Sequence, residues 1–362
     1  MSNKNTLINN LNYILSIKRP HSSESVKKVT EWIFNQIPKK LKNKSFFDDF
    51  GNLHIDNRQN KKINKTLFIG HVDTVHKIGG VNKIKKTTTN WLANGDPLGA
   101  DDGAGCTLLI HLIKNNIKGY YIFSQGEECG GLGAKFIVKN YSFLLSEFDC
   151  AIAFDRKGVD SVISYQGVRC ASDRFCENLS SVLNSTNSDF MYSKDDSGIY
   201  TDTAEFVHII PECTNISVGY DHEHSDKENL NIVHFKNLAA GILLINWDNL
   251  TIERDPKLIE NKYFPSNWLE SYPIDNYVNP LNYTKSELFR ESIFDALSGD
   301  KESLLDFIAY EVYPVDCNFA SDFLNPDFLT EDILEDILEL SYFEDVSVIL
   351  FQLYDLVYCE RY

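Results

Sequence analysis

Residues 1–250 alternate short apolar runs with segments whose apolar residues recur at helical spacing, and this alternation strongly limits the possible folds. The apolar runs have the length of strands and lie at 52–56, 66–72, 120–125, 150–155, 161–166 and 214–219. The helical patterns lie at 23–37, 103–116, 132–141, 173–185 and 230–247. Strand-like runs that alternate with helical patterns are typical of a layered α/β fold, which we expect here.

Charge divides the chain into two parts of different kind. Of the 362 residues, 286–362 hold 19 Asp and Glu against 3 Lys and Arg, which leaves 33 acidic against 32 basic residues in 1–285. Four of the ten prolines, at 256, 265, 273 and 280, precede the acidic part. We therefore expect a main domain over 1–250, a Pro- and aromatic-rich connector over 251–283, and an acidic helical C-terminal extension or small domain over 284–362.

Composition also limits the class of protein. The net charge of −17 argues against a nucleic-acid-binding surface. The N-terminal "MSNKNTLINN" does not resemble a signal peptide, and no apolar run is long enough to span a membrane. The eight cysteines form no CxxC pair, so we interpret them as reduced thiols. These features predict a cytoplasmic protein without a membrane partner.

Five apolar runs lead to a histidine or an acidic residue. In chain order these endings are His71 with Asp73, Asp101, Glu127 with Glu128, Asp155, and the segment 221–224, which contains His222 and His224. The carboxyl ends of strands in an open α/β sheet face the ligand crevice, so the five endings can converge there. Imidazole and carboxylate ligands suit zinc, with cobalt or manganese as possible substitutes.

The stretch "LGADDGAG" places Asp101 beside Asp102. Adjacent carboxylates repel each other unless a cation or a shared proton relieves the repulsion. A helix N-cap is the ordinary explanation for this pair, and an exposed charged loop is the ordinary explanation for 221–228. Five such coincidences in chain order favour a site instead. A site with two divalent ions would use one acid of the pair as a bridge.

The segments "GHVDTV", "LGADDGAG", "GEECGGLGA", "AFDRKG" and "HEHSDKENL" resemble, in this order, the signature segments of the co-catalytic dinuclear zinc peptidases. That superfamily includes zinc aminopeptidases, glutamate carboxypeptidases and related amidohydrolases, and the resemblance covers about residues 20–250. It implies a three-layer α/β/α domain with a central mixed sheet, and it makes 1–250 the catalytic domain. The chain between Asp155 and His224 leaves no room for a lid domain, which resembles the single-domain aminopeptidase branch.

The resemblance also implies a role for each site residue and two Zn²⁺ ions per chain. His71 and Asp155 would hold one zinc ion, Glu128 and His224 the other, and Asp101 would bridge them, with His222 as the alternative to His224. Asp73 would orient His71, and Glu127 would be the general base. A cis peptide bond after the bridging Asp101 is a further expectation.

The function expected from the sequence is hydrolysis of an amide bond, with an aminopeptidase first. Arg169 or Lys157 could instead anchor a substrate carboxylate, which would favour a carboxypeptidase or an N-acyl amino acid deacylase. Tyr165 and Tyr220 lie near strand ends as candidates for oxyanion stabilisation. A non-catalytic binding protein on a peptidase scaffold remains an alternative. The acidic part could recruit a protein partner or mediate self-association.

Overall fold

The computed structural model describes residues 2–257 and 293. The chain divides into two units between residues 262 and 263, and the fold below is that of the first unit. Residues 258–283 of the connector predicted over 251–283 lie outside the described residues. Of the acidic helical part predicted over 284–362, only residue 293 is described.

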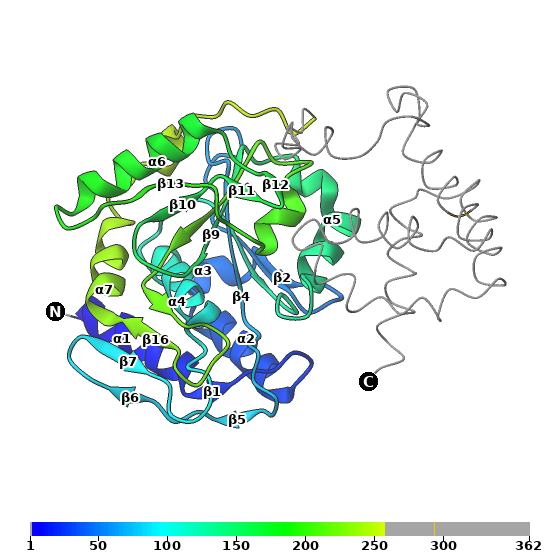
Figure 1. Cartoon of the computed structure of the whole chain (residues 1–362). Helices are drawn as coiled ribbons and strands as arrows, with labels where there is room; N and C mark the ends of the chain where they lie inside the picture. Colours follow the sequence, from blue (N-terminus) through cyan, green and yellow to red (C-terminus); the bar gives the residue numbers. More distant parts are fainter. Residues whose placement is uncertain (1, 258–292, 294–362) are drawn as a thin grey trace. The chain divides into compact units, whose positions relative to one another are not determined.

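A mixed sheet of eight strands forms the centre of the described part (Figure 1). In spatial order the strands are β13 (Ser193–Asp195), β10 (Ser161–Ile163), β14 (Glu212–Ser217), β9 (Cys150–Arg156), β4 (Thr66–His71), β8 (Tyr120–Ser124), β3 (Leu53–Asp56) and β2 (Ser45–Phe47). Strands β14, β9, β4 and β8 are parallel to one another, whereas β8, β3 and β2 pair antiparallel. All residues of β14, β4 and β8 are buried, as expected for strands covered on both faces.

Helices flank this sheet (Figure 1). They are α1 (Ser2–Leu15), α2 (Glu24–Gln36), α3 (Lys39–Lys42), α4 (Ala100–Lys114), α5 (Leu132–Leu145), α6 (Asp173–Thr186), α7 (Ile232–Gly241) and the short 3-10 helices η1 (Asp202–Phe206) and η2 (Trp247–Asn249). Gly70 of β4 faces α4, while Ser124 of β8 contacts Asp202 of η1. The predicted three-layer α/β/α architecture is therefore confirmed.

Smaller sheets lie beside the central one. One has four strands, β15 (Tyr220–Asp221), β16 (Asn229–Asn231), β7 (Asn90–Leu92) and β6 (Lys85–Lys86). Two more are strand pairs, β1 (Ile17–Lys18) with β5 (Gly80–Val81) and β11 (Tyr165–Gln166) with β12 (Val168–Arg169). The sequence run 161–166, expected as one strand, is thus divided between β10 and β11.

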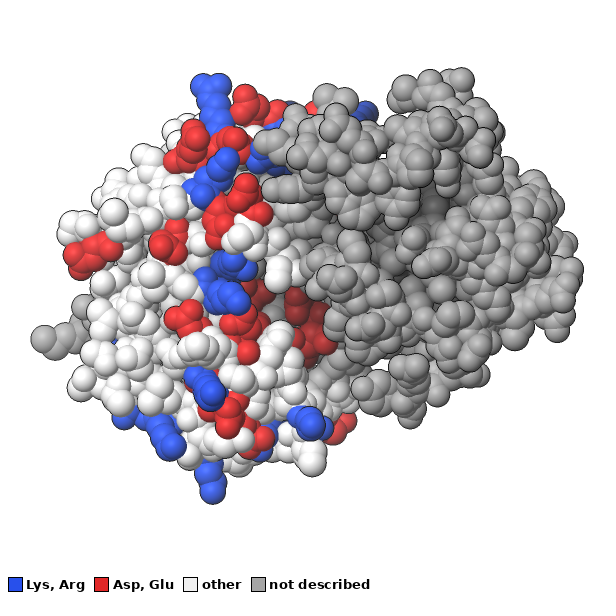
Figure 2. Space-filling view, in the orientation of Figure 1, with Lys and Arg blue, Asp and Glu red and all other residues white. Residues whose placement is uncertain are grey.

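On the face seen in Figure 2, basic and acidic side chains intermix in a band rather than separating into patches of one sign. This agrees with the balanced charge of residues 1–285. Among the described residues, no helix is both long enough and apolar enough to cross a bilayer.

Candidate metal centre

The parallel strands bring the predicted site residues to one edge of the sheet. His71 is the last residue of β4, and it pairs in register with Ser124, the last residue of β8. Asp155 is the penultimate residue of β9. Asp101 lies where α4 begins, and Glu127 and Glu128 follow β8. The site therefore forms where the carboxyl ends of three neighbouring parallel strands meet.

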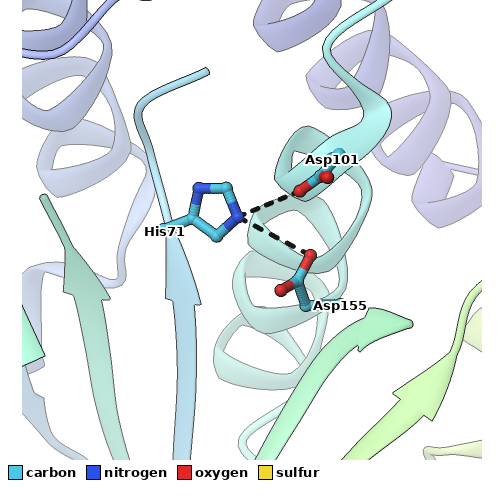
Figure 3. A group of neighbouring side chains, drawn as sticks. All are labelled: His71, Asp101 and Asp155. Carbon is cyan, nitrogen blue, oxygen red and sulfur yellow. Dashed lines mark hydrogen bonds and ion pairs between the residues drawn. The ribbon is translucent and has the colours of Figure 1, made fainter. Parts of the chain in front are cut away.

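A first group of ligand atoms consists of His71, Asp101 and Asp155, all buried (Figure 3). The Nε2 atom of His71 lies 3.0 Å from Oδ1 of Asp101 and 3.6 Å from Oδ1 of Asp155. One ligand atom from each residue lies within 4.8 Å of the others, so a single cation can contact all three.

A second group consists of Asp101, Glu128 and His224. The Nε2 atom of His224 lies 3.1 Å from Oδ2 of Asp101 and 3.0 Å from Oε2 of Glu128. The two carboxylate oxygens of Asp101 thus face different groups. His222 belongs to neither group found among the described residues.

The donor set fits two divalent cations. Each group combines one imidazole with two carboxylates, and no thiolate takes part, which suits zinc, cobalt or manganese. The buried Oε1 atom of Glu128 has no hydrogen-bond partner. A buried carboxylate oxygen without a partner is costly, and a cation would supply one.

Electrostatics favour a cation as well. Burial raises the pKa of Glu127 well above its usual value, and it raises the pKa of Asp155 to about 6 with the help of the Asp101 charge. Hydrogen bonds to Asp101 and Glu128 raise the pKa of His224 to about 11. Burial is the main cause of the raised pKa of the two acids, whereas the raised pKa of His224 reflects the carboxylates of Asp101 and Glu128, whose negative charge a bound cation would offset.

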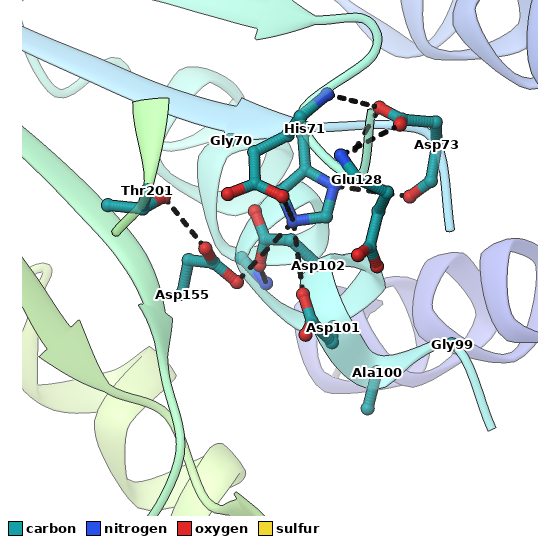
Figure 4. Close-up of polar contacts among 12 residues, drawn as sticks. Gly70, His71, Asp73, Gly99, Ala100, Asp101, Asp102, Glu128, Asp155 and Thr201 are labelled. Atoms are coloured by element: carbon teal, nitrogen blue, oxygen red, sulfur yellow. Dashed lines mark hydrogen bonds and ion pairs between the residues drawn. The ribbon is translucent and has the colours of Figure 1, made fainter. Parts of the chain in front are cut away.

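Asp73 holds the loop that carries the two glutamates (Figure 4). Its carboxylate accepts hydrogen bonds from the backbone amides of Gly126 (2.7 Å), Glu127 (3.3 Å) and Glu128 (3.2 Å). Its backbone carbonyl lies 3.2 Å from Nδ1 of His71, whereas its carboxylate lies 3.8 Å away. The support expected for His71 thus comes mainly from the main chain of Asp73. The carboxylate fixes the position of Glu127, whose Oε2 lies 3.8 Å from Nε2 of His71.

Asp102 differs from its neighbour Asp101. Its side chain is fully buried and accepts a hydrogen bond from the amide of Gly105 at 2.8 Å. Burial, together with the charge of Asp155, raises the pKa of Asp102 well above its usual value. The peptide bond between Asp101 and Asp102 is cis, as expected. The pair is therefore one acid that faces both ligand groups and one that lies beneath them.

Thr201 and Glu228, which are not among the predicted site residues, and Tyr220, predicted only for oxyanion stabilisation, hold Asp155 and Asp101 in place. The hydroxyl of Thr201 donates to Oδ2 of Asp155 at 2.8 Å, and that of Tyr220 donates to Oδ1 of Asp155 at 3.1 Å. Tyr220 is therefore engaged with a ligand residue. Glu228 accepts hydrogen bonds from the turn that carries Asp101. The only sequence signal for Glu228 is its place four residues after His224 in "HSDKE".

The candidate anchors for a substrate carboxylate are paired with acids. Arg169 forms an ion pair with Asp173 at 2.6 Å, and Lys157 forms one with Glu223 at 2.7 Å.

Solved structures of aminopeptidases share this fold. Aminopeptidase PepT from Bacillus cereus matches with a TM-score of 0.51 and 15% identity over 66% of this chain and 96% of its own. The TET1 peptidase of Pyrococcus horikoshii matches with a TM-score of 0.51 and 15% identity, covering 66% and 98% of the two chains. A tripeptidase from Staphylococcus aureus gives 0.50 and 16%, covering 66% and 96%. No family model and no curated protein matches the sequence.

These likenesses show the fold, and the fold is the one expected from the resemblance to co-catalytic zinc peptidases. The described part of the chain combines an aminopeptidase-like fold with two candidate metal groups that share Asp101.

Proposed function

We propose that this chain is a dinuclear zinc-dependent aminopeptidase, which removes N-terminal residues from peptides in the cytoplasm. The observation that carries the proposal is the position of Asp101. Its two carboxylate oxygens face two different groups of candidate ligands at the carboxyl ends of the parallel strands. His71 and Asp155 would hold one ion, and Glu128 and His224 the other. Bound ions would lower the pKa of a water molecule and polarise the scissile carbonyl.

Glu127 is the proposed general base. Its carboxylate is close to the first group, 3.8 Å from Nε2 of His71, and its backbone is fixed by Asp73. The raised pKa of this buried acid suits a group that takes a proton from the attacking water and returns it to the leaving amine. Glu127 could therefore carry out both proton transfers of the reaction without a second acid.

An aminopeptidase is favoured over a carboxypeptidase or an N-acyl amino acid deacylase. The latter two require a cation that binds the substrate carboxylate, and both candidates, Arg169 and Lys157, have acidic partners. A free α-amine instead suits a site rich in carboxylates. The non-catalytic alternative predicts a missing ligand or base, but all the proposed residues lie together.

The experiment measures metal content and activity of the purified full chain. Aminoacyl-p-nitroanilides and N-acyl amino acids serve as substrates, beside Glu127→Gln and the exposed control Glu177→Gln. We expect about two zinc ions per chain, aminoacyl turnover that Glu127→Gln reduces at least about 100-fold with both ions retained, and no change in Glu177→Gln. Turnover of N-acyl substrates alone would show an N-acyl amino acid deacylase in place of an aminopeptidase. A chain without metal under zinc-replete conditions would refute the proposal.

Self-association belongs to the same proposal. The TET1 peptidase of Pyrococcus horikoshii is described as assembling into a tetrahedron or a large octahedral shell. Light scattering of the full chain would give its mass, and a monomer at all concentrations would exclude self-association.

A further inference from the structure

Glu228 joins the two segments that carry Asp101 and His224. Its side chain is buried, with 1% of its surface exposed. Its carboxylate accepts hydrogen bonds from the backbone amides of Gly99 (3.0 Å), Ala100 (2.7 Å) and Asp101 (3.2 Å). Glu228 closes the loop 221–228, whose fourth residue is His224. One carboxylate therefore links a loop that carries one ligand to a turn that carries another.

The turn 99–101 depends on this contact because it precedes the regular part of α4. Asp101 and Asp102 have non-helical φ/ψ angles, and the regular helix is capped by Asp102, whose Oδ1 accepts from the amide of Gly105 at 2.8 Å. Gly99, the residue before the helix, has a left-handed φ of 71° and no side chain to accept from the first amides. No side chain of the turn accepts from the amides of 99–101, so Glu228 supplies their acceptor from 127 to 129 residues away in the sequence. On its other side, the turn is held by Arg19, whose Nη2 donates to the carbonyl of Gly99 at 2.9 Å.

Glu228 is itself held firmly by the main chain. Its carbonyl accepts from the amide of Ala93 at 2.8 Å, and its amide donates to the carbonyl of Ser225 at 3.1 Å. It also directly precedes β16, which pairs with β7. The Glu228 carboxylate therefore holds the turn 99–101 in a fixed position relative to the sheet that contains β16 and β7.

The two ligand groups differ in how they are supported. His71 and Asp155 lie on the neighbouring strands β4 and β9, each two residues beyond Ile69 and Ala153, the last pair of their backbone ladder. None of the residues of the second group lies on the central sheet. His224 has a φ of 62° and a side chain that is 51% exposed, so packing alone does not hold it.

From this difference we infer that Glu228 is a positioning residue for the second group: it holds Asp101 and His224 in register so that Asp101, Glu128 and His224 can bind an ion together. The inference rests on the proposed function only in taking the two groups as metal sites. The first group keeps its two strand-borne ligands without Glu228. Glu228 positions two of the three residues of the second group but only Asp101 of the first, so its loss weakens binding of the second ion much more than binding of the first.

The test is a zinc titration of the metal-free full chain by calorimetry, with wild type beside Glu228→Gln. Glutamine keeps the shape of the side chain, but its NH₂ group cannot accept from the amides of the turn. We expect wild type to bind two ions. In Glu228→Gln, one ion should bind about 10- to 100-fold more weakly, and the other should stay within about threefold of wild type.

Glu212→Gln is the matched control. Glu212 is also a fully buried carboxylate that accepts from three backbone amides, those of Ser172 (2.7 Å), Glu253 (2.8 Å) and Arg254 (2.9 Å). These contacts are all outside the metal groups. The control should lower the melting temperature of the metal-free chain and leave both zinc affinities unchanged.

A second comparison identifies which ion is affected. His224→Ala removes a ligand of the second group, so Glu228→Gln added to it should weaken zinc binding little further. An additive effect would overturn the inference. If Glu228→Gln does not fold, Glu228→Asp keeps the charge but is too short to reach all three amides, and the same titration decides.

The remaining outcomes are distinct. Wild type that binds no pair of ions refutes the proposed function. Wild type that binds two ions, with Glu228→Gln the same as wild type or weakened equally at both sites, refutes the inference alone.

Discussion

At the scale of single residues, Gly105 shows how tightly the start of α4 packs against the side chain of Asp102 and against strand β9. A Cβ atom on Gly105 would lie 2.3 Å from Oδ1 of Asp102 and 2.5 Å from the carbonyl oxygen of Phe154. Alanine inside a helix normally stabilises it by about 1 kcal/mol relative to glycine. Here we expect Gly105→Ala to lower the free energy of unfolding by about 2–3 kcal/mol, measured by urea denaturation.

Gly95→Ala is the control for this substitution. Gly95 has a φ of 95°, but a Cβ atom there would meet nothing within 4 Å, so only backbone strain of about 1–2 kcal/mol applies. A stabilised Gly105→Ala variant would show that α4 moves to accept the methyl group.

His234 is a pH-dependent element of stability outside the metal centre. Burial lowers the pKa of His234 to about 4, and its Nε2 lies 2.9 Å from the hydroxyl of Tyr192. The unfolded chain takes up a proton as the pH falls through about 6.5, whereas the folded chain stays neutral down to about 4. The unfolded state therefore gains protons first, and the stability that neutral His234 contributes is lost between these pH values.

We expect wild type to lose up to about 3 kcal/mol relative to His234→Gln when the pH is lowered from 7 to 4. The measurement is the difference in free energy of unfolding between the two proteins at several pH values. A difference that does not change with pH would contradict the prediction.

The residues that could be predicted from the sequence are those that end an apolar run. His71 and Asp155 are examples, because the end of a parallel strand and a crevice coincide in this fold class. Thr201 and Glu228 could not be predicted in the same way. Their roles depend on contacts with distant segments: no local pattern marks Thr201, and only its place four residues after His224 marks Glu228.

At the scale of elements, two helices begin with a serine cap but depend on it to different degrees. The Oγ atom of Ser23 accepts from the amide of Val26 at 3.2 Å, and that of Ser172 accepts from Phe175 at 3.1 Å. The hydroxyl of Ser172 also donates to the buried carboxylate of Glu212 at 2.8 Å. Loss of Ser172 therefore removes a helix cap and a partner of a buried acid.

We expect Ser23→Ala to lower the free energy of unfolding by about 1 kcal/mol and Ser172→Ala by about 2–3 kcal/mol. Chemical denaturation of both variants measures the difference. Equal losses would mean that another group replaces the hydroxyl at Glu212.

Helices α2 and α6 follow their predicted ranges to within one residue, because amphipathic spacing and a serine cap are local signals. Helix α5, which has no side-chain cap, begins where predicted but runs to Leu145, four residues beyond the predicted end at 141. Helix α7 ends at Gly241, before the predicted end at 247. Helix α1 was not predicted, since its first residues are polar; Leu7, Leu11 and Ile14 bury its inner side. The strands of the small sheets are two or three residues long, too short for any periodic pattern.

At the scale of the whole molecule, metal removal should weaken the fold. Asp101, Glu128 and Asp155 lie close together and mostly buried, so the chain without cations retains their mutual repulsion. Ions that bind only the folded state stabilise it by about 2.7 kcal/mol per site at 100 times the dissociation constant.

We expect the melting temperature of the full chain to fall by about 5–10 °C in chelator and to recover with added zinc. Added magnesium, which prefers oxygen ligands and retains its water, should restore little. An unchanged melting temperature in chelator would contradict metal binding at either group.

The layered architecture could be predicted because alternating strands and helices have few ways to pack. The order of the strands could not, since β4 lies between β8 and β9 through pairings among segments far apart in the sequence. The antiparallel addition of β3 and β2 at one edge is likewise a tertiary choice.

The five proposed ligands are spread from residue 71 to residue 224, and the last of them lies on a loop that follows the central sheet. During synthesis, a growing chain cannot complete the second group until that loop has left the ribosome. Unfinished or prematurely terminated chains that end before it thus lack part of the centre. Under the proposed function, hydrolysis would therefore become possible only after all eight strands of the central sheet have been synthesised.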